Sequence, residues 1–197
     1  VNSTFNLINH RVGLIHGLLD KGYEIVAVSP TDEFASRLKE LDCHHVPLQM
    51  ERKGTHIGRD LMLFWRYRRL LKQHMPDIYL GFTAKPNIYG SLAAQSLGIP
   101  VINNISGLGT VFGAMSASFV GKALSRLLRV LYRFALLRSD KVFFQNKDDR
   151  REFIEQGVVK ADLTDLLPGS GVDLDRFAYT PIIASDFSMK ISGELKQ

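Results

Sequence analysis

The chain of 197 residues has one cysteine, Cys43, and no long apolar run. A single cysteine excludes an internal disulfide framework and suits a reducing compartment. The six histidines are scattered and give no zinc-ligand spacing. No stretch reaches the roughly 18 consecutive apolar residues that a membrane-spanning helix needs, and no secretory signal is visible. These absences favour a cytoplasmic protein that is soluble or lies on a membrane surface, with no structural metal.

Glycine is missing where a dinucleotide-binding domain requires it. Such a domain carries G-x-G-x-x-G between its first strand and first helix. The corresponding loop here, from Ser3 to His10, contains no glycine. A role in binding NAD is therefore disfavoured.

Residues 76–112 contain the most informative pattern. Ile78–Thr83 and Val101–Ile105 are short apolar segments that predict strands, and Ile88–Leu97 between them predicts a helix that Gly98 and Pro100 bring to an end. Two parallel strands joined by a helix place the loops after both strands on the carboxyl edge of the sheet. Open α/β folds bind their ligands at that edge.

The remaining sequence alternates in the same way. Val1–Ser3 resembles the end of a strand. The expected strands are Glu24–Ser29, His44–Leu48, Lys141–Gln145 and Leu163–Leu167, and the expected helices are Asn9–Lys21, Glu33–Leu41, Arg59–His74, Phe119–Arg138 and Lys147–Gln156. Alternating strands and helices predict an α/β fold, a Rossmann-like parallel sheet with helices on both faces.

Four motifs carry a resemblance to a known family. KPNIYGSLAA, INNISGLGTVF, LLPGSGVDLDRF and RKGT together resemble the amino-terminal half of a bacterial family-4 glycosyltransferase, a retaining enzyme of the GT-B fold. The resemblance implies an acceptor-side domain over residues 1–177, whose first strand is truncated. It also implies that residues 178–197 begin a linker or a disordered tail, and that the donor-binding domain would follow.

The resemblance also implies a function. The whole enzyme would move a hexose or N-acetylhexosamine from a nucleotide-sugar, probably UDP-linked, to a lipid-linked saccharide in surface-polysaccharide synthesis. It would need no metal and no cofactor, and the donor would bind through the second domain, so this segment alone would be inactive. The expected location is the inner face of the cytoplasmic membrane.

Polar and basic residues that follow the predicted strands are the candidate acceptor or phosphate ligands. Cations and helix N-termini suit a diphosphate, whereas Asn, Ser and Gly suit sugar hydroxyls and close backbone approach. The candidates are His10, Arg11, Arg52, Lys53, Thr55, Lys85, Asn87, Asn104, Ser106, Gly107 and Gly109. A structural alternative exists for several of them, such as capping of a helix by His10 or Asn87.

Basic residues predominate before residue 139, where 17 Lys and Arg face 9 Asp and Glu. In the predicted helix at 119–138 the cations Lys122, Arg126, Arg129 and Arg133 recur with no acidic residue, opposite an apolar stripe that includes Leu127 and Phe134. This pattern is typical of a helix on an anionic membrane surface. Nucleic acid is a weaker candidate because no stacking motif accompanies the charge.

A second class of function remains open from the sequence. A non-catalytic α/β module that binds anionic lipid or a protein partner would show the same charge pattern and the same fold. The paired glutamates that the family carries in its donor domain are missing from these 197 residues, which favours this alternative for the chain as it stands.

Overall fold

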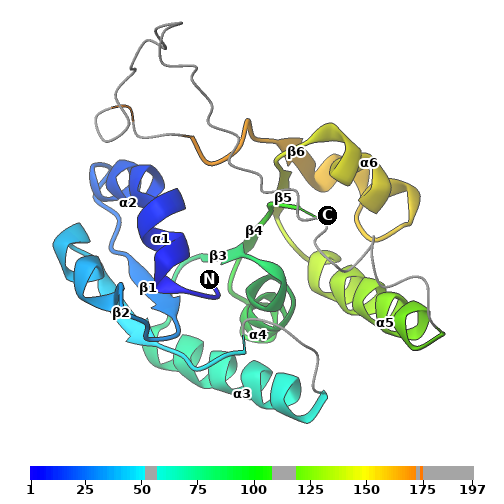
Figure 1. Ribbon diagram of the computed structural model, residues 1–197, viewed down its shortest axis with the longest axis horizontal. Helices are drawn as coiled ribbons and strands as arrows, with labels where there is room; N and C mark the ends of the chain where they lie inside the picture. Colours follow the sequence, from blue (N-terminus) through cyan, green and yellow to red (C-terminus); the bar gives the residue numbers. More distant parts are fainter. Residues whose placement is uncertain (52–56, 108–118, 172–173, 175–197) are drawn as a thin grey trace, which may run out of the picture.

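The computed structural model describes residues 1–51, 57–107, 119–171 and 174 (Figure 1). Four of the candidate ligands, Arg52, Lys53, Thr55 and Gly109, lie outside the described residues, as does the expected tail at 178–197.

All strand pairs are parallel, as the sequence predicts. Two strands form one sheet in the order β1-β2, and four strands form a second in the order β3-β4-β5-β6. Their bounds are β1 Val26–Ser29, β2 His44–Pro47, β3 Tyr79–Phe82, β4 Val101–Ile105, β5 Lys141–Phe144 and β6 Thr164–Leu166. The amine of Val1 donates to the carbonyl of Val28 in β1 (3.0 Å), so residues 1–3 lie beside the first sheet. They form no strand of their own.

Helices cover both sides of this row of strands. Figure 1 shows the strands running diagonally from β2 to β6, with α1 and α2 on one side and α3, α4, α5 and α6 on the other. The bounds are α1 Thr4–His10, α2 Val12–Leu19, α3 Ile57–His74, α4 Ser91–Gln95, α5 Phe119–Leu136 and α6 Lys147–Glu155; 3-10 turns lie at η1 Ala35–Leu41 and η5 Ala161–Leu163, and a π-helical turn, η2 Pro86–Gly90, runs into α4.

Successive strand residues point to opposite faces, and the core follows this alternation. Tyr67 of α3 packs with Tyr79 and Val101 of the strands in one cluster. Phe144 and Phe153 belong to a second cluster under α5 and α6. A third cluster joins α1, α2, η1 and β1, and Phe82 of β3 packs against it. Phe82 therefore faces the side of the sheet that carries α1 and α2.

The first helix begins earlier than predicted. The expected helix at Asn9–Lys21 is two helices separated at Arg11, and α1 starts at Thr4 because the hydroxyl of Ser3 caps it by accepting from Asn6 N (3.3 Å). The free N–H of Thr4 at the helix start donates to the Asp32 carboxylate (2.9 Å). The positive end of this helix dipole is therefore occupied by an acid of the same chain, and it does not lie at His10.

Candidate functional site

Arg11 lies where four segments of the carboxyl edge meet. Its guanidinium lies over the ring of Phe82, 4.5 Å from the centroid. Its Nη1 donates to the hydroxyl of Ser170 in the turn after β6 (2.7 Å) and to the carbonyl of His10 (3.2 Å). Gln145, directly after β5, donates to the same Ser170 hydroxyl (3.3 Å). Arg11 thus connects the α1–α2 junction with the ends of β3, β5 and β6.

The charge of Arg11 is held by neutral groups. The residue is 7% exposed, and the described contacts of its side chain are a carbonyl, a hydroxyl and an aromatic ring. Burial lowers the pKa of the guanidinium, although arginine stays protonated in proteins. Its Nε is shielded from solvent and has no hydrogen-bond partner within the described part of the chain. A buried cation of this kind would bind an anion or a hydroxyl oxygen strongly.

Two side-chain oxygen atoms of residues next to Phe82 are also buried without a hydrogen-bond partner among the described residues. Asn104 is the Cα partner of Phe82 in the β3–β4 register, so both side chains lie on one face. Asn104 Oδ1 and Thr83 Oγ1 are shielded from solvent and have no hydrogen-bond partner among the described residues. Arg11, Thr83 and Asn104, here termed the edge cluster, therefore come from three segments: Arg11 lies over the Phe82 ring, Asn104 is the strand partner of Phe82, and Thr83 follows Phe82 in the chain.

Asn87 does not belong to this cluster, because its side chain is paired on the other face of the sheet. It is 1% exposed, its Nδ2 donates to the carbonyl of Asn104 (2.9 Å), and its Oδ1 accepts from Asn103 Nδ2 (3.0 Å). Asn103 also donates to Ser91 Oγ (2.7 Å) and accepts from Ser139 Oγ (2.7 Å). We term these four side chains the asparagine network. It pairs the amide of Asn87 within the chain, and a role of Asn87 in binding stays a prediction.

Lys85 is also paired within the chain, although the sequence predicts it as a phosphate ligand. Its Nζ lies 2.7 Å from Asp60 Oδ1, and the two side chains are only 13% and 5% exposed. Asp60 belongs to the first turn of α3. Burial and the Asp60 charge raise the pKa of the neighbouring Tyr89 phenol. The carboxylate of Asp60 neutralises the charge of Lys85. The two residues are 25 positions apart, so no local sequence pattern reveals this ion pair.

The other described candidates lie at the surface. His10 ends α1 and is exposed, with its ring at an edge-on distance of 6.3 Å from Phe5. Ser106 and Gly107 follow β4 and are exposed. Gly107 has φ +140°, a conformation that favours glycine. These residues leave the loop after β4 accessible on the same edge as the edge cluster.

Sequence reasoning missed three residues of this region. Thr83, Gln145 and Ser170 each follow a strand directly or within a short turn. The rule that ligands bind outside the carboxyl ends of parallel strands would have selected them. The sequence places Thr83 and Gln145 inside the predicted strands Ile78–Thr83 and Lys141–Gln145, and nothing in the LLPGSGVDLDRF motif distinguishes Ser170 from its neighbours.

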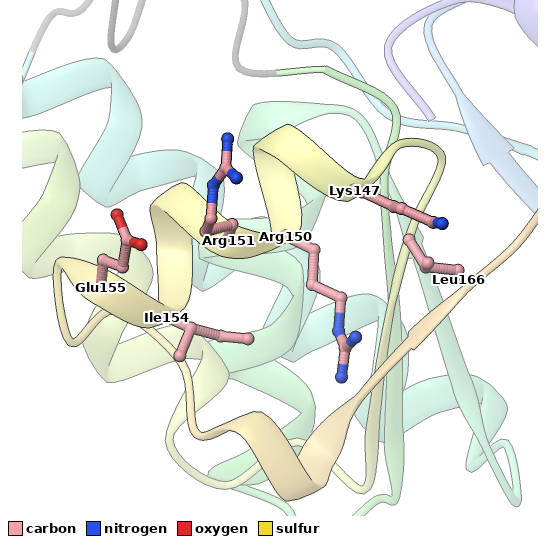
Figure 2. A pocket seen from close by; sticks show the side chains of 6 residues that line it. All are labelled: Lys147, Arg150, Arg151, Ile154, Glu155 and Leu166. Carbon is pink, nitrogen blue, oxygen red and sulfur yellow. The ribbon is translucent and has the colours of Figure 1, made fainter.

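A cavity of 360 Å³ between α6 and β6 is lined by Lys147, Arg150, Arg151, Ile154, Glu155 and Leu166. Figure 2 shows the guanidinium groups of Arg150 and Arg151 pointing in opposite directions. Arg150 donates to Thr164 Oγ1 (2.7 Å), and Arg151 pairs with Asp148 (2.9 Å). The cations do not converge on one point, so the cavity does not form an anion site.

Helix α5 presents a mixed outer face. Lys122, Arg126 and Arg133 are exposed. Four apolar side chains are exposed between them: Leu127 (40%), Val130 (43%), Phe134 (60%) and Leu137 (51%), the last just beyond the helix end. Leu127 and Phe134, which the sequence places opposite the cations, are therefore exposed as well. Arg129 is only half-buried at the margin and interacts within the chain, so it does not belong to this outer face.

Two searches of the described residues found neither a metal site nor a membrane span. No three His, Cys, Asp or Glu side chains gather there in a way that could hold a metal ion. No described helix is both long and apolar enough to cross a bilayer.

The comparison with known families adds the identity of the domain. Residues 9–169 match the model of the glycosyl transferase 4-like domain. The chain belongs to this family. A related curated protein is the N,N'-diacetylbacillosaminyl-diphospho-undecaprenol alpha-1,3-N-acetylgalactosaminyltransferase of Campylobacter jejuni, which is 22% identical over 173 residues, covering 87% of this chain and 45% of that protein.

Solved structures share the fold. A glycosyltransferase from Rickettsia africae superposes with a TM-score of 0.60 at 14% identity, covering 90% of this chain and 43% of that one. HepE of Anabaena, in complex with UDP and glucose, superposes with a TM-score of 0.58 at 17% identity, covering 87% and 44%. The glycosyl transferase 4-like domain thus has the predicted Rossmann-like architecture of GT-B enzymes, and the chain spans less than half the length of these relatives.

Proposed function

We propose that this glycosyl transferase 4-like domain is the acceptor-binding part of a glycosyltransferase. The enzyme transfers a sugar from a UDP-linked donor to a lipid-linked saccharide. The observation that carries the proposal is the family match over residues 9–169. The named acceptor of the Campylobacter relative supports a lipid diphosphate carrier, and UDP in the HepE complex supports the donor.

The edge cluster supports the same function through its chemistry. Saccharide and diphosphate oxygens are hydrogen-bond acceptors that would satisfy Arg11, and saccharide hydroxyls are donors that would satisfy Asn104 Oδ1. Because retaining transfer needs the leaving diphosphate stabilised by cations or helix dipoles, the family does not require a metal ion. In this proposal the described residues position the acceptor, and the donor binds in the part of the enzyme that follows.

Transfer itself is the direct test. The longest form of the protein that its gene encodes is incubated with radiolabelled UDP-sugars and membranes that contain polyprenyl-diphosphate-linked saccharides. We expect one labelled, lipid-extractable product with one donor. Arg11→Gln, which keeps the size and removes the charge, should raise the KM for the acceptor about tenfold or more. Failure of every UDP-sugar to label a lipid would contradict the proposal.

We also propose that the outer face of α5 binds the anionic membrane where the acceptor lies. The helix contains no Asp or Glu, and its exposed cations flank the exposed apolar stripe formed by Leu127, Val130, Phe134 and Leu137. Cations near an anionic surface contribute about 1 kcal/mol each. Apolar side chains enter the interface between the headgroups. In this proposal the outer face of α5 holds the domain on the inner membrane surface.

The membrane proposal predicts different responses to salt. Replacing Lys122, Arg126 and Arg133 with Gln should lower partitioning into anionic vesicles by roughly a hundredfold, or about 3 kcal/mol, at low salt. The difference should shrink at high salt because exposed charges are screened within roughly 8 Å already at physiological ionic strength. Phe134→Ser should lower partitioning by a similar factor at both salt concentrations.

A matched control variant removes three positive charges from the surface outside α5. Lys21, Arg37 and Lys160 are exposed cations outside α5, and their replacement with Gln should leave partitioning nearly unchanged. Equal losses in the two triple variants would mean that net charge, rather than the α5 face, drives binding. Vesicles of neutral lipid should bind wild type and both variants weakly.

A further inference from the structure

Thr83 has a backbone conformation that threonine disfavours. Among the described residues, Asp42, Met75 and Thr83 are the non-glycine residues with positive φ, at 50°, 44° and 67°. Asp42 caps the end of η1 and Met75 directly follows α3, positions where the left-handed conformation is common. Thr83 lies at the end of a strand, and its branched side chain makes this conformation strained.

The side chain of Thr83 adds a second unfavourable feature. Its hydroxyl is shielded from solvent and has no hydrogen-bond partner within the described part of the chain, although its carbonyl accepts from Asn87 N (3.0 Å). Glycine or asparagine would adopt this φ with less strain, and valine would fill the same space without an unpaired hydroxyl. Strain and an unpaired group at one residue are typical of a site whose partner is a ligand.

The neighbours of Thr83 indicate the class of ligand. Asn104 Oδ1, on the adjacent strand, is an unpaired acceptor, so it needs a donor. A diphosphate has no proton to donate at neutral pH, whereas a sugar hydroxyl both donates and accepts. Arg11 Nε, over the ring of Phe82, needs an acceptor. The unpaired oxygens of Thr83 and Asn104 therefore fit a saccharide hydroxyl, and the guanidinium of Arg11 fits an acidic or carbonyl oxygen.

We propose that Thr83 is a specificity-determining residue that hydrogen-bonds, together with Asn104, to a hydroxyl of a bound saccharide. The inference rests on the proposed function and deepens it. Thr83 directly follows Phe82, the strand partner of Asn104, so the two residues lie at the same edge of adjacent strands. Because both oxygens are shielded from solvent in the ligand-free chain, a local rearrangement uncovers them when the sugar binds.

The test uses Thr83→Val, which removes the hydroxyl and keeps the shape, in the 197-residue chain. The probes are methyl α-N-acetylglucosaminide, N-acetylglucosamine 1-phosphate and inorganic phosphate, titrated by ligand-observed NMR. We expect the variant to bind both sugar probes about tenfold more weakly and phosphate equally. Its Tm should stay constant or rise by about 2–4 °C because an unpaired buried hydroxyl is removed. Thr83→Ser, which keeps the hydroxyl, should bind like wild type.

Thr164→Val is the matched control on the other face of the same sheet. The Thr164 hydroxyl accepts from Arg150 (2.7 Å) and donates to the Ala161 carbonyl (2.8 Å). This variant should lose Tm and keep its affinity for sugar, the opposite of Thr83→Val. Equal sugar affinity in wild type and Thr83→Val, or no sugar binding by wild type, overturns the inference.

The transfer assay separates this inference from the proposed function. If the encoded enzyme transfers sugar and Thr83→Val leaves the KM for the acceptor unchanged, the inference fails while the function stands. If no donor is used but the Thr83-dependent sugar binding is found, the function fails while the inference stands. If the proposed function and the inference are both right, Thr83→Val raises the KM for the acceptor and leaves the KM for the donor unchanged.

Discussion

Asn103 and Asn104 are the same residue type at successive positions of β4, yet their surroundings differ completely. Asn103 faces α4 and α5 and takes part in the asparagine network, where its amide group is paired on both sides. Asn104 faces the side that carries α1 and α2, where its Oδ1 is unpaired among the described residues. The face of the sheet, rather than the residue type, separates a structural asparagine from a candidate ligand.

The same division applies to the cations. On the side of the sheet that carries α3, the charge of Lys85 is neutralised by Asp60. On the side that carries α1 and α2, the described contacts of Arg11 are all with neutral groups. A buried polar group that is paired stabilises one conformation, and one that is unpaired is an energetic cost unless a ligand binds it. Three experiments test this contrast.

The largest effect is expected at the buried ion pair. Asp60→Asn leaves Lys85 buried without its counter-charge and should lower the free energy of unfolding by about 3–5 kcal/mol. Urea denaturation followed by circular dichroism measures the loss. The double variant Asp60→Leu with Lys85→Met, which removes both charges, should recover most of it. Equal stability of Asp60→Asn and wild type would mean that Lys85 is free to bind an anion after all.

The two asparagines give the sharpest test of the contrast. Asn103→Ala removes the partner of Asn87 Oδ1 and of Ser91, and each buried group left unpaired costs about 1–3 kcal/mol, so the total loss should be roughly 2–5 kcal/mol. Asn104→Ala removes an unpaired oxygen and should cost about 1 kcal/mol or less. The same denaturation experiment compares them. Similar losses from both variants would remove the distinction between the two faces.

The smallest effect is expected at Asp165, the last of the residues that pair across the sheet in register with Asn104. Phe82, Asn104, Phe143 and Asp165 are successive partners across β3 to β6. Asp165 is on the exposed edge strand, where the N–H of Leu166 and then the charge of Lys141 lower the pKa of its carboxyl. A lowered pKa stabilises the fold above the ordinary value of about 3.9, and this contribution is lost as pH falls through the folded value. Asp165→Asn should therefore lower Tm slightly at pH 7 and match wild type at the lowest pH. A constant difference across pH would contradict this.

The sequence predicted the architecture because hydrophobic alternation and helix-stop residues are local. The predicted strands at Val101–Ile105 and Lys141–Gln145 agree with β4 and β5 to within a residue. The start of α1 was missed because Ser3 and Asp32, 29 positions apart, jointly satisfy its first N–H groups. A cap formed by a distant acid leaves no periodic signal.

The site was predicted only in outline. The carboxyl-edge rule correctly selected Arg11 and Asn104 as residues of the edge. It could not separate Lys85 and Asn87 from them, because the sequence places all four near the ends of predicted strands and their roles depend on partners in α3, β4 and the α5–β5 turn. Which face a side chain takes and which distant group pairs with it are properties of the assembled sheet.

The division of the strands into two sheets has a consequence for local opening. Within the described strands none pairs between β1 and β3, so side-chain packing joins the two parts: Phe82 packs on the α1–α2 cluster, and Val28 and Val46 pack on the cluster that contains Tyr67 and Tyr79. Backbone amides are protected from hydrogen exchange by the units that open together. The part that contains β1, β2 and η1 can open while β4 and β5 keep their pairing. Arg11 lies between α1 and α2 in the first part and contacts Phe82 in the second. Its contact with Phe82 would therefore be lost when the first part opens.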